Sequence, residues 1–226
     1  IRFVGVDIPQ GATISDAYVQ FKTDEMHSQA TSLTIEAQDS DNAQPFTSSM
    51  WNISNRATTG TGVWWDPAAW TTLREVGAAQ RTPDLSSIIQ EVVNRPGWSN
   101  GNSLVLIITG TGERVADSYD GDHNGAPLLH VEYSTGPAAN QAPNDDGELT
   151  DSDTVIIGDN EPGPGGEIIT EEVRVTTNSD DAEESASGSM NLTSSDLELV
   201  YDHGDQTVGI RFVGVDIPQG ATISDA

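Results

Sequence analysis

The sequence predicts an all-β protein, a jelly-roll-like β-sandwich that contains one short helix. Three observations predict it: apolar segments of strand length, turn residues between them, and a single stretch with helical periodicity. The strand segments are rich in β-branched and aliphatic residues, and Gly, Asn, Asp or Pro flanks them. They include AYVQFKT (17–23), SLTIEAQ (32–38), SLVLIITG (103–110) and PLLHVEY (127–133).

The helix is predicted at about 83–95. Its apolar side chains recur at the spacing that places them on one face of a helix. We expect this face to pack against a sheet. The residues concerned are Leu85, Ile88, Ile89, Val92 and Val93.

The chain ends with a copy of its own beginning. The sequence IRFVGVDIPQGATISDA occupies residues 1–17 and again residues 210–226, without a single difference. The distance from Ile1 to Ile210 is one period of 209 residues (210 − 1). We therefore expect the chain to be one period of a tandem array.

The repeat suggests three parts: a β-sandwich body (1–136), an acidic linker rich in Pro and Gly (137–166), and the first strands of the next repeat (167–226). The body alone would leave a sheet edge unpaired, which is costly. We expect strands of an adjacent repeat to complete the sandwich by strand complementation. The alternative is a closed monomer in which the last part folds back across the linker.

Charge limits the partners. The chain has 36 acidic and 9 basic residues, a formal net charge of -27. This surface repels nucleic acids, and the sequence has no apolar run long enough for membrane insertion. The charge attracts divalent cations, although solubility alone also accounts for it. Because the sequence has no cysteine, disulfides cannot stabilise it, and calcium is the stabilising ligand we expect.

The clearest candidate calcium loop is DGDHNG at 120–125, in which Asp120, Asp122 and Asn124 present side-chain oxygens. The loop lacks the acidic twelfth residue of an EF-hand, so other ligands must come from elsewhere. An acidic turn that stays solvated is the alternative. The further candidate ligands are Asp117, Asp180, Asp181, Glu183 and Glu184.

Two consecutive tryptophans are candidates for stacking on sugar rings. Trp64 and Trp65 stand in a strand-like segment, so their side chains point to opposite faces and one can be exposed. Packing in the core or at its rim is the alternative for both residues.

The order of these segments resembles a known family. LELVYD, QTVGIRFVGVDIPQGATISDAYVQF, the 83–95 helix, NSLVLIITGTG and APLLHVEY together resemble the DNRLRE-type β-sandwich domains of secreted bacterial proteins. That family is similar to carbohydrate-binding modules with a jelly-roll fold. The resemblance implies a sandwich fold and an extracellular or cell-surface location.

Two functions follow as expectations. The first is a structural module of an extracellular filament or giant surface adhesin, with neighbouring copies of itself as partners. The alternative is a carbohydrate-binding module of a secreted polysaccharide-active protein, with polysaccharide as partner. We expect no enzyme activity and no catalytic residues, because the sequence has no nucleophile or metal motif of a hydrolase.

Overall fold

The computed structural model describes residues 12–135, 168–202 and 204–215. These residues form an all-β fold with three antiparallel sheets and one α-helix, as predicted. Among them, no helix has the length and the apolar character needed to cross a membrane. The predicted linker, 137–166, lies outside the described residues, as do 1–11 and 216–226 of the two identical copies.

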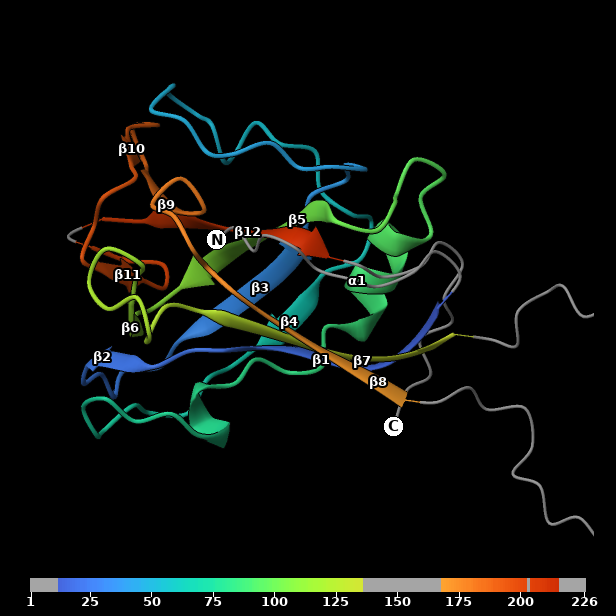
Figure 1. Cartoon of the computed structure of the whole chain (residues 1–226). Helices are drawn as coiled ribbons and strands as arrows, with labels where there is room; N and C mark the ends of the chain where they lie inside the picture. The colour runs from blue at the N-terminus through green and yellow to red at the C-terminus, as the bar shows by residue number, and fades with distance from the viewer. Residues whose placement is uncertain (1–11, 136–167, 203, 216–226) are drawn as a thin grey trace, which may run out of the picture.

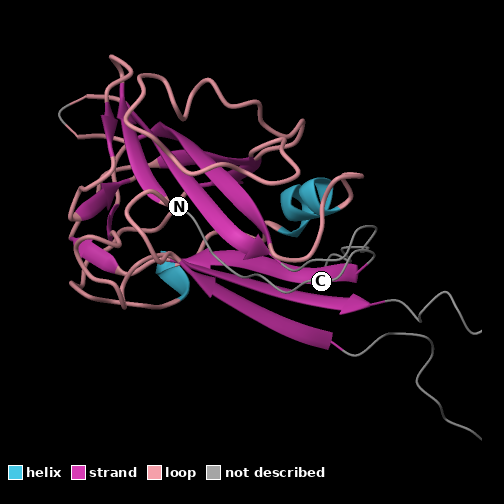
Figure 2. Cartoon of the chain, turned by 45° about the horizontal axis from the view of Figure 1, so that its top comes forward, coloured by secondary structure: helices cyan, strands magenta, loops and turns pink. Residues whose placement is uncertain are grey.

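The largest sheet has six strands in the order β10-β9-β12-β5-β3-β4. Its strands are β3 (Ser32–Ala37), β4 (Val63–Trp65), β5 (Asn102–Thr111), β9 (Asp181–Ser185), β10 (Met190–Asn191) and β12 (Gln206–Val215). A second sheet, in the order β1-β7-β8, packs against it to form the other layer (Figures 1 and 2). Its strands are β1 (Ala12–Gln20), β7 (Leu128–Thr135) and β8 (Ile168–Arg174).

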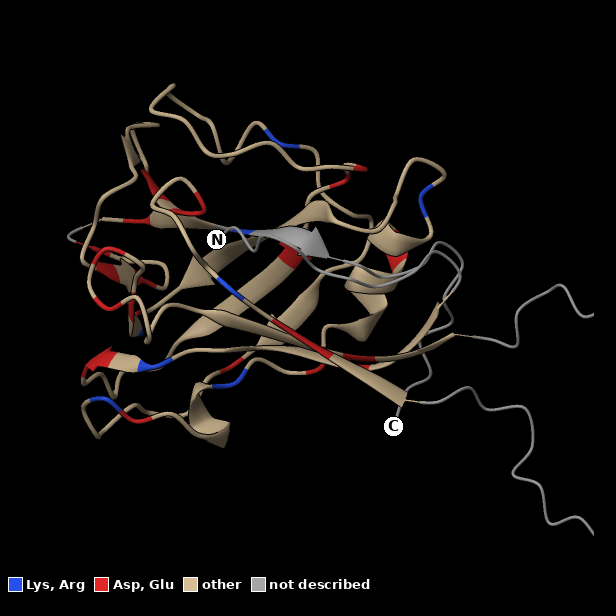
Figure 3. Cartoon of the chain, in the orientation of Figure 1, with Lys and Arg blue, Asp and Glu red and all other residues tan. Residues whose placement is uncertain are grey.

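A third, small sheet lies at one end of the sandwich in the order β11-β6-β2 (Figure 1). Its strands are β2 (Thr23–Glu25), β6 (Val115–Asp117) and β11 (Asp196–Glu198). Acidic residues gather at this end (Figure 3).

The main core fills the space between the two larger sheets. Alternate residues of β1, β3, β5 and β7 point into it, as their apolar/polar alternation predicts. Leu104, Leu106 and Ile108 of β5 face this core, whereas Val105 and Ile107 face a second cluster with Phe46 and Ile53. Both faces of β5 are therefore covered, which explains its continuous apolar sequence.

The helix α1 (Ser86–Val93) is shorter than the predicted 83–95. Its apolar face is buried in the main core, as expected, and contacts β1 and β3. The residues just before the helix are hydrogen-bonded to β1. Thr82 Oγ1 accepts the Val19 N–H, and Asp84 Oδ1 accepts the Ala17 N–H. A short 3₁₀ helix (Ala78–Gln80) precedes this segment.

The strands after the linker complete the sandwich from within the same chain. The sequence-based expectation that an adjacent copy supplies them is thereby corrected. β8 pairs with β7, β11 with β6, and β12 with β5. The chain can close on itself because Ser134 pairs with Ile168, so the end of β7 and the start of β8, the two ends of the connection, lie side by side. The entropic cost of closing such a connection grows only slowly with its length.

The C-terminal copy of the repeated stretch takes an interior place in this fold. Residues 210–215 belong to β12, which lies between β9 and β5. Residues 12–17 of the N-terminal copy form the first part of β1, which pairs with β7. The first half of the repeated stretch therefore forms part of β12 in the C-terminal copy, and the second half forms the start of β1 in the N-terminal copy.

Candidate metal centre

The acidic stretch at β9 is buried rather than solvated. Asp180, Asp181, Glu183 and Glu184 have exposed fractions between 0% and 4%. β9 lies between β10 and β12, and the second apolar cluster, with Ala182, covers one of its faces. Each buried carboxylate therefore requires a partner.

All four carboxylates bind protein groups, and Asp180 and Glu184 are the first two. Asp180 forms an ion pair with Arg211 of β12, with 3.4 Å between Oδ1 and Nη1. Glu184 Oε2 accepts the backbone N–H of Ile53 at 2.7 Å and that of Ser54 at 3.2 Å. Both residues therefore fix parts of the fold.

Asp181 joins β9 to the predicted calcium loop. Its Oδ2 accepts the Tyr119 N–H at 2.6 Å, so the start of β9 contacts the 117–124 segment. Burial is the main cause that raises the pKa of Asp181 to about 7; the charges of Asp120 and Asp180 add to the shift, and the Tyr119 N–H opposes it. A carboxylate in this position favours a nearby cation.

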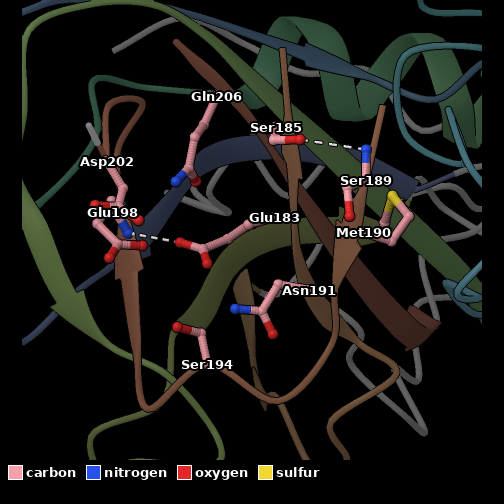
Figure 4. Close-up of a pocket in the computed structure, with 9 residues that line it drawn as sticks. All are labelled: Glu183, Ser185, Ser189, Met190, Asn191, Ser194, Glu198, Asp202 and Gln206. Carbon is pink, nitrogen blue, oxygen red and sulfur yellow. Dashed lines mark hydrogen bonds between the residues drawn. The ribbon is translucent and has the colours of Figure 1, made fainter. Parts of the chain in front are cut away.

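Glu183 faces a carboxylate that sequence reasoning missed. Glu183 Oε1 accepts the backbone N–H of Glu198 at 2.9 Å, and the two carboxyl groups interact directly (Figure 4). Burial, and then the Glu198 carboxyl group, raise the pKa of Glu183 to about 10. Two facing carboxyl groups require a shared proton or a cation between them.

These two residues line a cavity of about 200 Å³ that is rich in oxygen atoms (Figure 4). Two buried oxygens at its wall, Glu198 Oε2 and Gln206 Oε1, have no hydrogen-bond partner. The lining residues are Glu183, Ser185, Ser189, Met190, Asn191, Ser194, Glu198, Asp202 and Gln206. Carboxylate, amide and hydroxyl oxygens are the ligands that calcium takes.

The sequence carried one signal for Glu198. In DLELVYD the apolar residues alternate, and Leu197 and Leu199 are buried in the core while Glu198 points to the other side. Asp202 lies beyond the alternating part, so its place at the cavity had no such signal.

A lysine lies between two of the predicted loop ligands. Lys22 Nζ is 2.6 Å from Asp117 Oδ2 and 2.6 Å from Asp122 Oδ2. Asp122 Oδ1 also accepts the Asn124 N–H, and Asn124 is exposed. The eight predicted ligands thus lie in several places around β9 and the 117–124 loop, and calcium binding stays a prediction.

Three further carboxylates lie close to one another in the small sheet. Asp24, Glu25 and Asp196 have carboxylate oxygens within 4.8 Å. Burial, and then a hydrogen bond with Asp117, raise the pKa of Asp24 to about 6. The spacing of these residues in the sequence did not indicate that they would meet.

The two tryptophans point to opposite faces of β4, as predicted. Trp64 is 66% exposed and Trp65 is 5% exposed, stacked on Phe21 at 5.9 Å between ring centroids. The Trp64 indole Nε1 donates to Asp66 Oδ1 at 3.0 Å. This hydrogen bond orients an exposed aromatic ring.

Comparison with protein-family models finds none that matches this chain, and no curated protein and no solved structure matches it either. The resemblance to DNRLRE-type domains therefore stays a prediction from the sequence.

Proposed function

We propose that this chain is a structural module of a repetitive extracellular filament or giant surface adhesin. One observation carries the proposal. The duplicated stretch supplies residues 210–215 of β12 from its C-terminal copy and the start of β1 from its N-terminal copy.

In an array, a single copy of the stretch serves both positions. Residues 206–215 form β12, the next five residues, DIPQG, lead to ATISDA, and the chain continues as β1. The repeating unit then begins near 168, passes through the repeat boundary and ends near 135 of the next copy. The chain described here has the same strands joined in a circularly permuted order.

The composition is consistent with this role. A strongly acidic module resists association with its many neighbours at high local concentration. Calcium bound near β9 would offset the repulsion between the buried carboxylates and stabilise each unit.

The test is a chain extended by one further period of 209 residues. The additional period should add a second unit that unfolds cooperatively at the melting temperature of the first. The flanking gene sequence should contain further copies. A single copy beside a catalytic domain would overturn the proposal.

A carbohydrate-binding module is the second candidate, and one observation favours it. Trp64 is the large apolar side chain with the highest exposed fraction among the described residues, and Asp66 holds its ring. Its partner would be a polysaccharide that presents the apolar face of a sugar ring.

A further inference from the structure

Lys22 is the only lysine of the sequence, and it stands directly opposite Asp117. In the pairing of β2 with β6, Thr23 lies opposite Ala116, and the Asp117 N–H donates to the Lys22 carbonyl at 3.0 Å. Residues directly opposite each other in an antiparallel pair present their side chains to the same face. The two strands therefore fix the amine and the carboxyl group against each other.

The contact between the two side chains is short but is not an ordinary hydrogen bond. Nζ lies 2.6 Å from Asp117 Oδ2, yet this buried oxygen has no partner in hydrogen-bond geometry. The contact of the same Nζ with Asp122 Oδ2, also at 2.6 Å, does meet that geometry. The amine thus approaches the Asp117 carboxyl group away from the direction a hydrogen bond prefers.

Water has little access to the Asp117 carboxyl group. The Asp117 side chain is 8% exposed, whereas that of Asp122 is 38% exposed. The backbone of Gly125 packs directly on the Asp117 carboxyl group, because a Cβ atom at this position would collide with Oδ2. Asp117 is therefore the desolvated acid of the pair.

A third carboxyl group supplies a proton carrier. Asp24 lies in β2, two residues after Lys22, and its carboxyl group hydrogen-bonds that of Asp117. This hydrogen bond places the Asp24 carboxyl group where it can pass a proton to or from the Asp117 carboxyl group.

We infer that Lys22 and Asp117 condense within the folded chain to an internal amide bond. The lone pair of the deprotonated Nζ attacks Cγ of Asp117, and the bond from Cγ to one carboxyl oxygen breaks. The two protons lost by the ammonium group pass, with Asp24 as carrier, to the departing oxygen, which leaves as water. The ion pair is thus converted into a neutral amide and one water molecule, without an oxidant or a cofactor.

Two physical effects favour this reaction. Fixed intramolecular groups react with effective molarities of about 10⁵ M or more. The product also replaces a largely buried ion pair, whose charges are costly to desolvate, with a neutral group. One effect slows it: the close contacts with the Asp117 and Asp122 carboxylates raise the pKa of Lys22, which favours the charged ammonium form.

The bond would join β2 to β6 and enclose the chain between them. In a sequence without cysteines, it would act as a covalent cross-link in the small sheet. The inference is independent of the proposed function, because it concerns one fold unit whether or not the units form an array.

The test is the intact mass of the folded, purified chain. We expect the mass to be lower than that of the sequence by one water, and proteolysis followed by tandem mass spectrometry to find Lys22 joined to Asp117. A folded chain with the full mass would overturn the inference. A link from Lys22 to Asp122 would overturn the assignment of Asp117.

Variants distinguish the amide from other products that have lost one water molecule. A succinimide at Asp120-Gly121 would lower the mass equally, but it would persist in Lys22→Arg, whereas the amide should vanish there and in Asp117→Ala. Asp122→Asn is the matched control, since it removes the other carboxylate at the same distance, and it should stay one water lighter. Asp24→Asn should keep the fold, measured by circular dichroism, and lose most of the cross-link; full cross-linking there would remove Asp24 from the mechanism.

Discussion

At the scale of single residues, the fold contains carboxylates whose pKa values are raised because β9 is buried. Asp181 is one of them, because burial raises its pKa from 3.8 to about 7 while the Tyr119 N–H holds one of its oxygens. The raised pKa means that the folded state binds a proton more tightly than the unfolded state does. Asp181 therefore contributes most stability below about pH 4 and loses that contribution as the pH rises towards 7.

The first prediction concerns this loss. Asp181→Asn keeps an acceptor for the Tyr119 N–H but cannot ionise. In the presence of a chelator, its free energy of unfolding relative to the wild-type chain should rise between pH 4 and pH 7, by up to about 4 kcal/mol. Urea unfolding of both chains across this range measures the difference. A difference that stays constant with pH would contradict the raised pKa.

At the scale of elements, β12 is the strand on which the six-stranded sheet depends. It pairs with β9 on one side and β5 on the other, and its Arg211 is 3% exposed. Arg211 forms its ion pair with Asp180 and also donates to Ser103 Oγ at 3.0 Å and to the Ala43 carbonyl. Arg211 therefore connects three segments of the chain.

The second prediction uses the repeat as its own control. Arg2 and Arg211 occupy the same position in the two identical copies. Arg211→Ala leaves Asp180 buried without its cation and should cost about 3–5 kcal/mol of unfolding free energy. Arg2→Ala should cost far less, because β12 already occupies the place between β9 and β5. Chemical denaturation of both variants gives the comparison, and equal losses would mean that the two copies exchange in this place.

The third prediction concerns β4. Trp64→Ala should abolish the quenching of tryptophan fluorescence by a polysaccharide that binds the chain, while the melting temperature changes little, because Trp64 is 66% exposed. Asp66→Ala should weaken the quenching, since it frees the indole ring.

Trp51, which is 40% exposed, provides the matched control. Trp51→Ala should leave the quenching by polysaccharide unchanged. A glycan array on which the wild-type chain gives no signal would leave only the structural role.

The sequence was informative about those elements that have a clear apolar pattern. β1, β3 and β7 alternate, β5 contains the continuous apolar run 104–108, and the helix has a single apolar face, so these five could be predicted. β9 could not, because its buried residues are mostly acidic and only the neighbouring strands and loops make their burial acceptable. The partner of β12 could not be predicted either, since an identical strand sequence fits an adjacent copy as well as its own chain.

The candidate site likewise has some features that the local sequence indicates and others that depend on the arrangement of the strands. The sequence indicated the 180s and the 117–124 segment as separate sources of candidate ligands, and the structure brings Asp181 into contact with Tyr119. The cavity with Glu198 and the position of Lys22 between two loop carboxylates depend on strand order, which local sequence does not specify.

At the scale of the whole molecule, the net charge of -27 governs the response to cations. Sodium chloride should stabilise the chain by screening alone. On the proposal that calcium binds near β9, calcium should raise the melting temperature further than sodium chloride of equal ionic strength, since a ligand of the folded state stabilises it.

This fourth prediction is measured by thermal unfolding with calcium, with chelator and with matched sodium chloride. Glu183→Gln should remove the part of the shift that is specific to calcium. Identical curves in calcium and in sodium chloride would remove the calcium assignment.

The pairing of Ser134 with Ile168 has a mechanical consequence for an array under tension. Each unit would be entered at β8 and left at β7, at neighbouring points on antiparallel strands that end on the same side (Figure 1). A pulling force would therefore peel these strands apart one hydrogen bond at a time, instead of shearing a whole ladder at once. The sandwich domains would lie to one side of the axis of force, and the residues that connect them would determine the length of the array. Unfolding that starts at β7 would then stop at an amide between Lys22 and Asp117. The force would pass through this bond, so the residues between Lys22 and Asp117 would bear none of it.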